Sequence, residues 1–385
     1  MTNAVTSPWR PEHLARLSDR PGDAPPVIRP GDLVRMSADH DVWDIGPVRT
    51  PAGALAEAGG AGLWLALSAP ARGDPADRHD IARLRLFARR GGGWDDLGPL
   101  FPEGAARGSR EWAGSATLDG DRLEVLYTAA GGRDPGAPHY DQRIVATTAR
   151  LSRRGDAIAW GDWTPHREVL AADGRIYAPT DGPGGEPGFI RAFRDPFPVR
   201  DPADGADWVL FAGSLAGARS RFDGAVGLAR ADGDGGYRLA PPLIAADGVN
   251  TELERPHLVV HGGRYHLLFS TQARTFAPGL DAPTGLYGFV APALRGPYRP
   301  INGSGLVLRN PPGEPSQAYS WMVLPDLRVV AFVDAYDLGG RSAEELAAAG
   351  PQEARRHFGG TIAPLQRIRL DGDRAGLATA GTVAR

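Results

Sequence analysis

The chain has 385 residues, 43 basic and 46 acidic side chains and a net charge of -3, so its charge gives no reason to expect binding to nucleic acid or an anionic membrane. It contains no cysteine, which excludes disulfides, thiolate metal sites and a cysteine nucleophile. All the basic residues other than histidine are arginine, which excludes a Schiff-base lysine and the lysine of a phosphate-binding loop.

No apolar run approaches the roughly 20 residues needed to cross a bilayer. The first residues, "MTNAVTSPWRPEHLARL", lack the apolar segment of a signal peptide. We therefore expect a cytoplasmic protein, or one secreted by a route that uses no signal peptide.

Helical signals are few. One lies at residues 11–17, "PEHLARL", and another at residues 342–350, where Ser342 and Glu345 have the spacing of a capping box. Elsewhere the 52 glycines and 35 prolines are spread along the chain. Short apolar or alternating runs lie between turn residues, a pattern typical of an all-β fold.

Five of these runs resemble one another, because each follows a polar or glycine-rich turn and ends in small or polar residues. They are "AGLWLALSA" (61–69), "DRLEVLYTA" (121–129), "DWVLFAGS" (207–214), "GRYHLLFST" (263–271) and "DLRVVAFVD" (326–334). Their spacing leaves room for one four-stranded sheet each, and radial repetition of such sheets makes a β-propeller. We therefore predict a single-domain, five-bladed β-propeller over residues 1–385, with residues 1–35 as an N-terminal extension packed on or near it. Two β-sandwiches in tandem are the alternative.

A polar motif precedes each run: "DVWD" (41–44), "REWAGS" (110–115), "RDPF" (194–197), "ELERPH" (252–257) and "QAYS" (317–320). Each motif alone also fits a structural role. Pro196, for example, favours an extended Asp195 in a turn, and "ERPH" fits a salt bridge at a strand start. In a propeller, however, the innermost strand of every blade lines the central channel. Five corresponding motifs would then converge on one pocket.

The motifs supply the side chains that bind and cleave sugars. Aromatic faces stack on C–H patches, and carboxylates and arginines bond pairs of hydroxyls. Cleavage of a glycosidic bond needs two carboxyl groups in different environments, one that donates a proton and one that is ionised. The candidates are the carboxylates Asp44, Asp195 and Glu254, the cations Arg194 and Arg255, and the aromatic residues Trp43, Trp112 and Tyr319.

At these motifs the chain resembles glycoside hydrolase family 68, the levansucrases, inulosucrases and β-fructofuranosidases, and most of all the compact levansucrases of Gram-negative bacteria. The matching stretches run from "DVWDIGPV" near residue 41 to "HFGGTIAP" near residue 357. The resemblance implies a retaining enzyme that cleaves sucrose through a covalent fructosyl intermediate and passes fructose to water or a sugar acceptor. A glycosidase of the same clan acting on another fructoside or a pentoside, and a catalytically silent sugar-binding propeller, are the alternatives.

The resemblance also implies roles by position. Asp44 matches the family nucleophile, Asp195 the transition-state stabiliser and Glu254 the general acid/base. The implied sugar contacts are Trp43, Trp112, Ala113, Arg194, Glu252, Arg255, Gln272 and Tyr319. The calcium site of some Gram-positive members has no counterpart in the sequence, so we predict no metal and no cofactor. The expected partners are sucrose and sugar acceptors, and we expect a monomer that binds neither nucleic acid nor membranes.

Three positions depart from the family pattern. Gln272 stands where levansucrases usually carry His or Arg, a residue associated with holding the acceptor sugar and with making polymer. Trp321 stands where His is common, and Ala113 is Ser in many members. The first two differences argue against synthesis of long-chain levan more than against sucrose cleavage.

Overall fold

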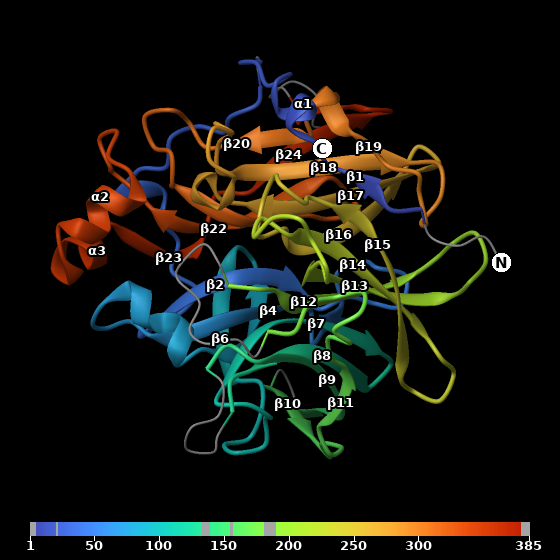
Figure 1. Ribbon diagram of the computed structural model, residues 1–385. Helices are drawn as coiled ribbons and strands as arrows, with labels where there is room; N and C mark the ends of the chain where they lie inside the picture. The colour runs from blue at the N-terminus through green and yellow to red at the C-terminus, as the bar shows by residue number, and fades with distance from the viewer. Residues whose placement is uncertain (1–4, 21, 133–138, 155–156, 181–189, 379–385) are drawn as a thin grey trace.

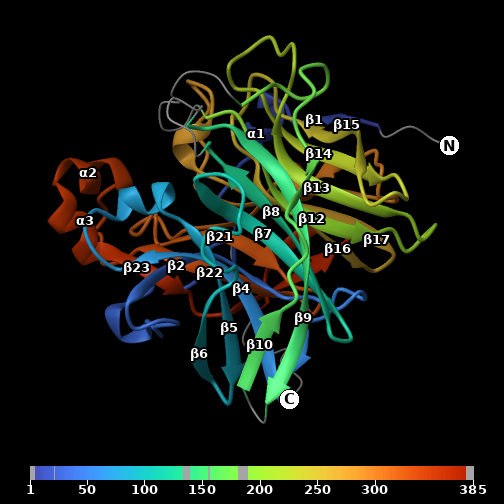
Figure 2. The ribbon, with the colours of Figure 1, turned by 90° about the horizontal axis from the view of Figure 1, so that it is seen from below.

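The computed structural model describes residues 5–378 except for residues 21, 133–138, 155–156 and 181–189. Within them the strands form five sheets arranged as the blades of a propeller (Figures 1 and 2). The predicted five-bladed, all-β fold is confirmed, and the alternative of two sandwiches is wrong. No helix in the described part of the chain is long and apolar enough to span a membrane.

The strands of the blades follow one another in chain order, apart from the short β1. Blade 1 contains β2 (His40–Pro47), β3 (Glu57–Ala58), β4 (Ala61–Pro70), β5 (Arg83–Arg90) and β6 (Gly93–Pro99). Blade 2 contains β7 (Arg110–Asp119), β8 (Arg122–Ala130), β9 (Gln142–Arg154), β10 (Ala157–Gly161) and β11 (Arg167–Leu170). Blade 3 contains β12 (Phe193–Arg200), β13 (Asp207–Ser214), β14 (Gly224–Ala231), β15 (Tyr237–Ala245) and β1 (Ser7–Pro8).

The last two blades are built in the same way. Blade 4 contains β16 (Glu254–His261), β17 (Arg264–Thr271), β18 (Gly285–Ala291), β19 (Arg299–Pro300) and β20 (Leu306–Arg309). Blade 5 contains β21 (Ala318–Val323), β22 (Arg328–Ala335), β23 (Phe358–Ile362), β24 (Gln366–Asp371) and β25 (Arg374–Leu377). The helices are α1 (Pro11–Leu14), α2 (Ala343–Ala348) and α3 (Pro351–His357), with 3-10 turns η1 (Pro30–Asp32), η2 (Pro75–Asp80), η3 (Ala273–Thr275) and η4 (Ile301–Gly303).

The polar motifs and the apolar runs occupy the first two long strands of each blade. The motif strands β2, β7, β12, β16 and β21 contact their neighbours around the ring and are therefore the innermost strands. The apolar runs form the second strands, and β4 and β13 are buried along nearly their whole length. They are continuously apolar instead of alternating because each face is covered by protein.

Each innermost strand shifts register against the second strand at its polar motif. In four of these bulges one residue has a left-handed backbone: Asp44, Asp195, Arg255 and Ser320 have φ values of 50°, 61°, 51° and 58°. Left-handed non-glycine residues are uncommon and cluster at functional sites. The extended conformation expected for Asp195 is wrong, because the bulge overrides the preference imposed by the following proline.

The N-terminal segment runs past several blades. Strand β1 pairs in parallel with β15 of blade 3, and the buried Trp9 packs edge-on against Phe269 and Phe289 of blade 4. The Ile28 N–H donates to Gln317 Oε1 of blade 5 at 3.0 Å. The segment is thus anchored to three blades before it enters blade 1.

In the part of the chain that the structure describes, blades 5 and 1 close the ring without exchanging a strand. Strand β2 packs against β22 and β23, and Arg355 of α3 forms an ion pair with the buried Asp41 of β2. The capping box predicted for α2 is present, since the Ser342 N–H donates to Glu345 Oε2 at 2.7 Å and the Glu345 N–H donates to Ser342 Oγ at 3.1 Å. The predicted helix at residues 11–17 is a single turn, α1, and α3 was not predicted from the sequence.

Candidate active site

One cavity of about 630 Å³ lies at the centre of the propeller, and all the site residues expected from the sequence line it. Ten of them come from the five polar motifs, and Gln272 directly follows β17: Trp43, Asp44, Trp112, Ala113, Arg194, Asp195, Glu252, Glu254, Arg255, Tyr319 and Gln272. Its outer part is lined by η2, by the segment after β17 and by α2 and α3. Site residues as far apart in the sequence as Trp43 and Tyr319 thus meet in one place because every blade contributes its innermost strand.

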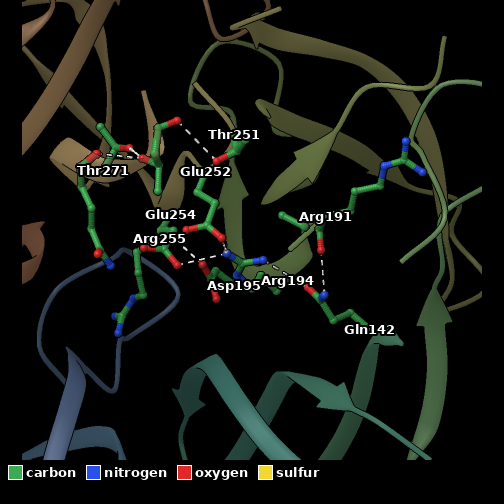
Figure 3. A network of polar contacts seen from close by, with 12 residues as sticks. Gln142, Arg191, Arg194, Asp195, Thr251, Glu252, Glu254, Arg255 and Thr271 are labelled. Atoms are coloured by element: carbon green, nitrogen blue, oxygen red, sulfur yellow. Dashed lines mark hydrogen bonds and ion pairs between the residues drawn. The ribbon is translucent and has the colours of Figure 1, made fainter. Parts of the chain in front are cut away.

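Arg194 is the cation at the centre of the polar network in Figure 3. Its Nη2 donates to Glu254 Oε1 at 3.0 Å and lies 3.4 Å from Glu252 Oε1. Gln142 holds the other side of the guanidinium, with Oε1 3.4 Å from Arg194 Nη1. The Arg194 side chain is only 7% exposed, and its carboxylate neighbours raise its pKa in spite of burial. A buried, permanently charged arginine therefore offsets the charges of the glutamates around it.

Asp195 lies beside this network and is held by one hydrogen bond from each of two other blades. Its Oδ2 accepts a hydrogen bond from the Arg255 N–H at 2.9 Å, and its own N–H donates to Thr128 Oγ1 at 3.0 Å. Burial raises the pKa of Asp195 to about 7, opposed by the charge of Arg194 and reinforced by Asp44. The carboxyl is thus fixed in orientation and is costly to ionise before a ligand binds.

Asp44 occupies the corresponding bulge of blade 1, with its side chain 20% exposed. Burial raises its pKa, and the Arg255 guanidinium is the largest opposing influence, with Nη1 3.9 Å from Asp44 Oδ1. The Ser320 hydroxyl opposes the rise as well. Both groups favour the ionised, nucleophilic form of this carboxylate.

Glu254 has a different environment. One carboxylate oxygen accepts from Arg194, and the other accepts a short hydrogen bond from the Tyr319 hydroxyl. Burial raises the pKa of Tyr319 well above its ordinary value, so the phenol keeps its proton and acts as a donor. Glu252 is the second partner of Arg194, and burial, reinforced by Glu254, raises the pKa of Glu252.

The aromatic walls are fixed by contacts with neighbouring residues. The Trp112 Nε1–H donates to the His79 carbonyl at 3.0 Å, and the His79 ring meets Trp43 edge-on at 5.8 Å. Ala113 follows Trp112 and its carbonyl accepts from Thr128 Oγ1 at 2.9 Å. These contacts leave the two indole rings as walls of the cavity.

His257 of "ELERPH" and Trp321, directly after "QAYS", have structural roles. His257 is fully buried, its Nε2 accepts from the Val323 N–H at 2.9 Å, and its Nδ1 therefore donates to the Arg255 carbonyl at 2.9 Å. Burial lowers the pKa of His257 to about 4, so the ring is neutral. Trp321 packs edge-on against Tyr319 at 6.0 Å and does not line the central cavity.

Several polar residues of the cavity were missed from the sequence. Ser320 occupies the same bulge position as Asp44 and Asp195, and this correspondence could have revealed it. Arg78 and Asp334 form an ion pair at 3.7 Å in the outer part of the cavity. His79 and Arg274 lie nearby in the short turns η2 and η3, where no periodic pattern marks them.

One group in the described part of the chain brings possible metal ligands within 4.8 Å of one another: Asp39, His40 and Asp96. It lies outside the cavity. Asp39 accepts from His40 Nδ1 at 2.7 Å, and Asp96 accepts from Arg85 Nε at 2.6 Å. These contacts already satisfy the acidic groups without an ion, and the prediction that the enzyme needs no metal remains a prediction.

Comparison with known proteins relates this arrangement to one family. The profile of the family described as Levansucrase/Invertase, glycoside hydrolase family 68, matches residues 15–224 and 220–381. Levansucrase LscA of Pseudomonas savastanoi pv. glycinea is 32% identical over 97% of this chain and 95% of its own length. The levansucrase of Erwinia amylovora is 32% identical over 95% of this chain and 92% of its own length.

Among solved structures, the kestose-bound inulosucrase from Halalkalicoccus jeotgali is 39% identical, with a TM-score of 0.89 over 97% of this chain and 95% of that chain. The levansucrase from Gluconacetobacter diazotrophicus shares the fold at 24% identity, with a TM-score of 0.82 over 98% and 90% of the two chains. The chain therefore belongs to glycoside hydrolase family 68 and is a fructosyl-transferring glycoside hydrolase of the levansucrase and invertase type.

Proposed function

We propose that the chain cleaves sucrose with Asp44 as nucleophile, Glu254 as general acid/base and Asp195 as stabiliser of the transition state. The observation that carries this assignment is the convergence of three carboxylates, from the innermost strands of three blades, on one cavity in which each has different partners. Retaining glycosidases need such a pair of unlike carboxyl groups about 5 Å apart.

In the first half-reaction Asp44 attacks the anomeric carbon of the fructosyl unit. Arg255, 3.9 Å from the Asp44 carboxylate, favours the ionised form that attack requires. Glu254 donates a proton to the glycosidic oxygen, and glucose leaves with that proton. The product is a fructosyl ester of Asp44.

Asp195 acts while the bond to glucose breaks and positive charge develops on the fructosyl ring. Its carboxylate is fixed by the Arg255 N–H, so it can accept hydrogen bonds from two fructosyl hydroxyls without reorganising. Electrostatic stabilisation by a pre-oriented group is among the largest catalytic effects. Trp43 and Trp112 supply the apolar faces against which the sugar ring stacks.

In the second half-reaction Glu254 takes a proton from water or from a hydroxyl of a sugar acceptor. The activated oxygen attacks the anomeric carbon, and the bond to Asp44 breaks. Two inversions give net retention. Tyr319 and Arg194 hold the Glu254 carboxylate during both steps, so the same group serves as acid and then as base.

The test is incubation of the purified protein with sucrose, with glucose and free fructose measured separately. Glucose should appear, and free fructose should fall below it by the amount transferred to sugar. Asp44→Asn should reduce kcat by about four orders of magnitude or more. The exposed Asp77→Asn, on the neighbouring turn η2, is the matched control.

Rapid quenching followed by mass spectrometry should find one fructosyl unit attached to a peptide containing Asp44. A protein that releases no glucose from sucrose would contradict the proposed activity. An Asp44→Asn variant with ordinary activity, or an adduct on another carboxylate, would contradict the assignment of the nucleophile.

A further inference from the structure

A second cavity, of about 220 Å³, adjoins the central one. Both are lined by Gln272, Arg274, Tyr319, Asp334 and Glu344. The remaining walls of the second cavity come from the end of blade 4 and from the loop before β21, so it lies between blades 4 and 5. A molecule bound in the central cavity can therefore extend past Tyr319 into this side cavity.

The loop that forms one wall is held in place by its own hydrogen bonds. Asn310 is buried, and its Nδ2 donates to the carbonyls of Pro315 and Ala318, each at 3.0 Å. Glu314 accepts from the Leu338 N–H at 2.8 Å. The loop is thus tied both to itself and to blade 5, and the side cavity exists without a ligand to shape it. Pre-formed cavities of this kind are typical of small-molecule sites.

Arg274 stands where the two cavities meet. Its Nε donates to Gln272 Oε1 at 2.7 Å, which fixes the plane of the guanidinium. Among the described residues, no carboxylate lies within 4.0 Å of it, in contrast to Arg194 and Arg255. Its Nη groups are therefore available to a ligand, and a guanidinium bonds a pair of oxygen atoms well.

The lining of the side cavity suits a sugar. Pro283 and Pro312 supply apolar surface, and Thr284 and Ser316 supply hydroxyl groups. The charges on the walls balance: Glu344 and Asp334 accompany Arg274, and the second arginine, Arg309, is paired with Asp19 and Asp23. A neutral, hydroxyl-rich ligand fits this mixture better than a phosphate or a carboxylate does.

The position of the side cavity relative to Glu254 indicates how an acceptor would lie, with its reacting end at Glu254 and its far end toward the side cavity. Tyr319 donates to Glu254 and lines both cavities. An acceptor whose attacking hydroxyl lies at Glu254 can therefore extend its outer units past Tyr319 and Gln272 into the side cavity. We propose that the side cavity binds the outer sugar unit of an oligosaccharide acceptor, and that Arg274, oriented by Gln272, binds its hydroxyls at the entrance. This inference rests on the proposed function.

The experiment compares two acceptors with sucrose as donor: glucose, and a fructosyl-sucrose trisaccharide. The quantity measured is the amount of fructose transferred to each acceptor divided by the amount released to water. Because it is a ratio, it does not depend on how fast sucrose is cleaved. Arg274→Ala removes the charge at the entrance, and Ser316→Trp fills the cavity. Arg264→Ala, an exposed arginine at the start of β17 in the same blade, is the matched control.

For the trisaccharide, the transfer ratio should fall about tenfold in Arg274→Ala, the loss expected for a charge-assisted pair of hydrogen bonds, and at least as much in Ser316→Trp. For glucose the ratio should change less than about twofold in Ser316→Trp, because Ser316 lines only the side cavity, and in Arg274→Ala it should fall less than the ratio for the trisaccharide does. Arg264→Ala should match the wild type with both acceptors.

The proposal would be overturned if wild type and Arg274→Ala had equal transfer ratios for the trisaccharide. This comparison is sufficient even if Ser316→Trp does not fold. Wild-type protein that splits sucrose but transfers nothing to the trisaccharide would overturn it too. Wild-type protein that releases no glucose from sucrose would instead refute the proposed function on which the inference rests.

Discussion

Replacing Asp195 by asparagine should stabilise the folded protein at neutral and alkaline pH while abolishing its activity. The carboxyl is 7% exposed, and its pKa is raised by burial to about 7. Asparagine has the same shape and its carbonyl can still accept from the Arg255 N–H, the bond that holds Asp195 at 2.9 Å. The substitution therefore removes the charge and keeps the geometry.

The magnitude follows from the difference between the folded and unfolded pKa of Asp195. A folded pKa of about 7, against 3.8 in the unfolded chain, makes ionisation about 4 kcal/mol more costly in the folded protein. Below about pH 4 both states are protonated and there is no cost. As pH rises toward the folded pKa the unfolded state ionises first, so wild-type stability falls, and above that pKa the full cost is present.

Asp195→Asn carries no such cost at any pH. Its free energy of unfolding should exceed that of the wild type by about 2–4 kcal/mol at about pH 8 and by much less at about pH 4. For a chain of this length, this corresponds to a rise in melting temperature of about 3–5 °C. Urea unfolding of both proteins at the two pH values measures the difference, with the exposed Asp207→Asn of the same blade as control.

A variant less stable than wild type at about pH 8, or a difference independent of pH, would refute the reasoning. Either result would mean that Asp195 is ionised in the folded protein at little cost and that Arg194 compensates for its burial. Activity is a separate readout, and kcat for sucrose should fall by several orders of magnitude because the neutral amide cannot stabilise a developing cation.

Three further substitutions test separate contacts. Tyr319→Phe removes a donor to Glu254 and should lower kcat about 10- to 100-fold with little effect on melting temperature; an unchanged kcat would exclude a positioning role. His257→Leu leaves the buried Arg255 carbonyl and Val323 N–H without their hydrogen-bond partners. The free energy of unfolding measured in urea should fall by about 2–5 kcal/mol, and a smaller fall would contradict this role. Trp9→Ala opens a cavity under blade 4 and should cost about 3–5 kcal/mol in the same assay; no change would show that the N-terminal segment does not stabilise the ring.

The sequence was sufficient to predict the blades and the centre of the site because both depend on patterns repeated within each blade. A motif strand such as residues 40–47 and the apolar strand after it are neighbours in the sheet, so their order along the chain predicts their arrangement in space. Once five such pairs are recognised, the convergence of Asp44, Asp195 and Glu254 follows from the geometry of a propeller.

The outer part of the cavity could not be predicted in this way. Arg78 and Arg274 lie on η2 and just after β17, in loops that differ between blades and have no repeating pattern. Ser320 was missed although it occupies a bulge equivalent to that of Asp195, because a serine between two aromatic residues gives no chemical signal by itself. The left-handed backbone at these positions is a property of the assembled sheet and has no local sequence signature.

Because the four left-handed bulge residues lie in four different blades, the functional group at each of these positions can be substituted independently of the others. The same backbone conformation presents a carboxylate from blade 1 and from blade 3, a guanidinium from blade 4 and a hydroxyl from blade 5. Each is encoded in its own blade, so a single codon change replaces one reactive group while the neighbouring walls keep their positions. A ring built in this way can acquire a new substrate by small substitutions at fixed points, without a new fold and without moving the chemistry it already has.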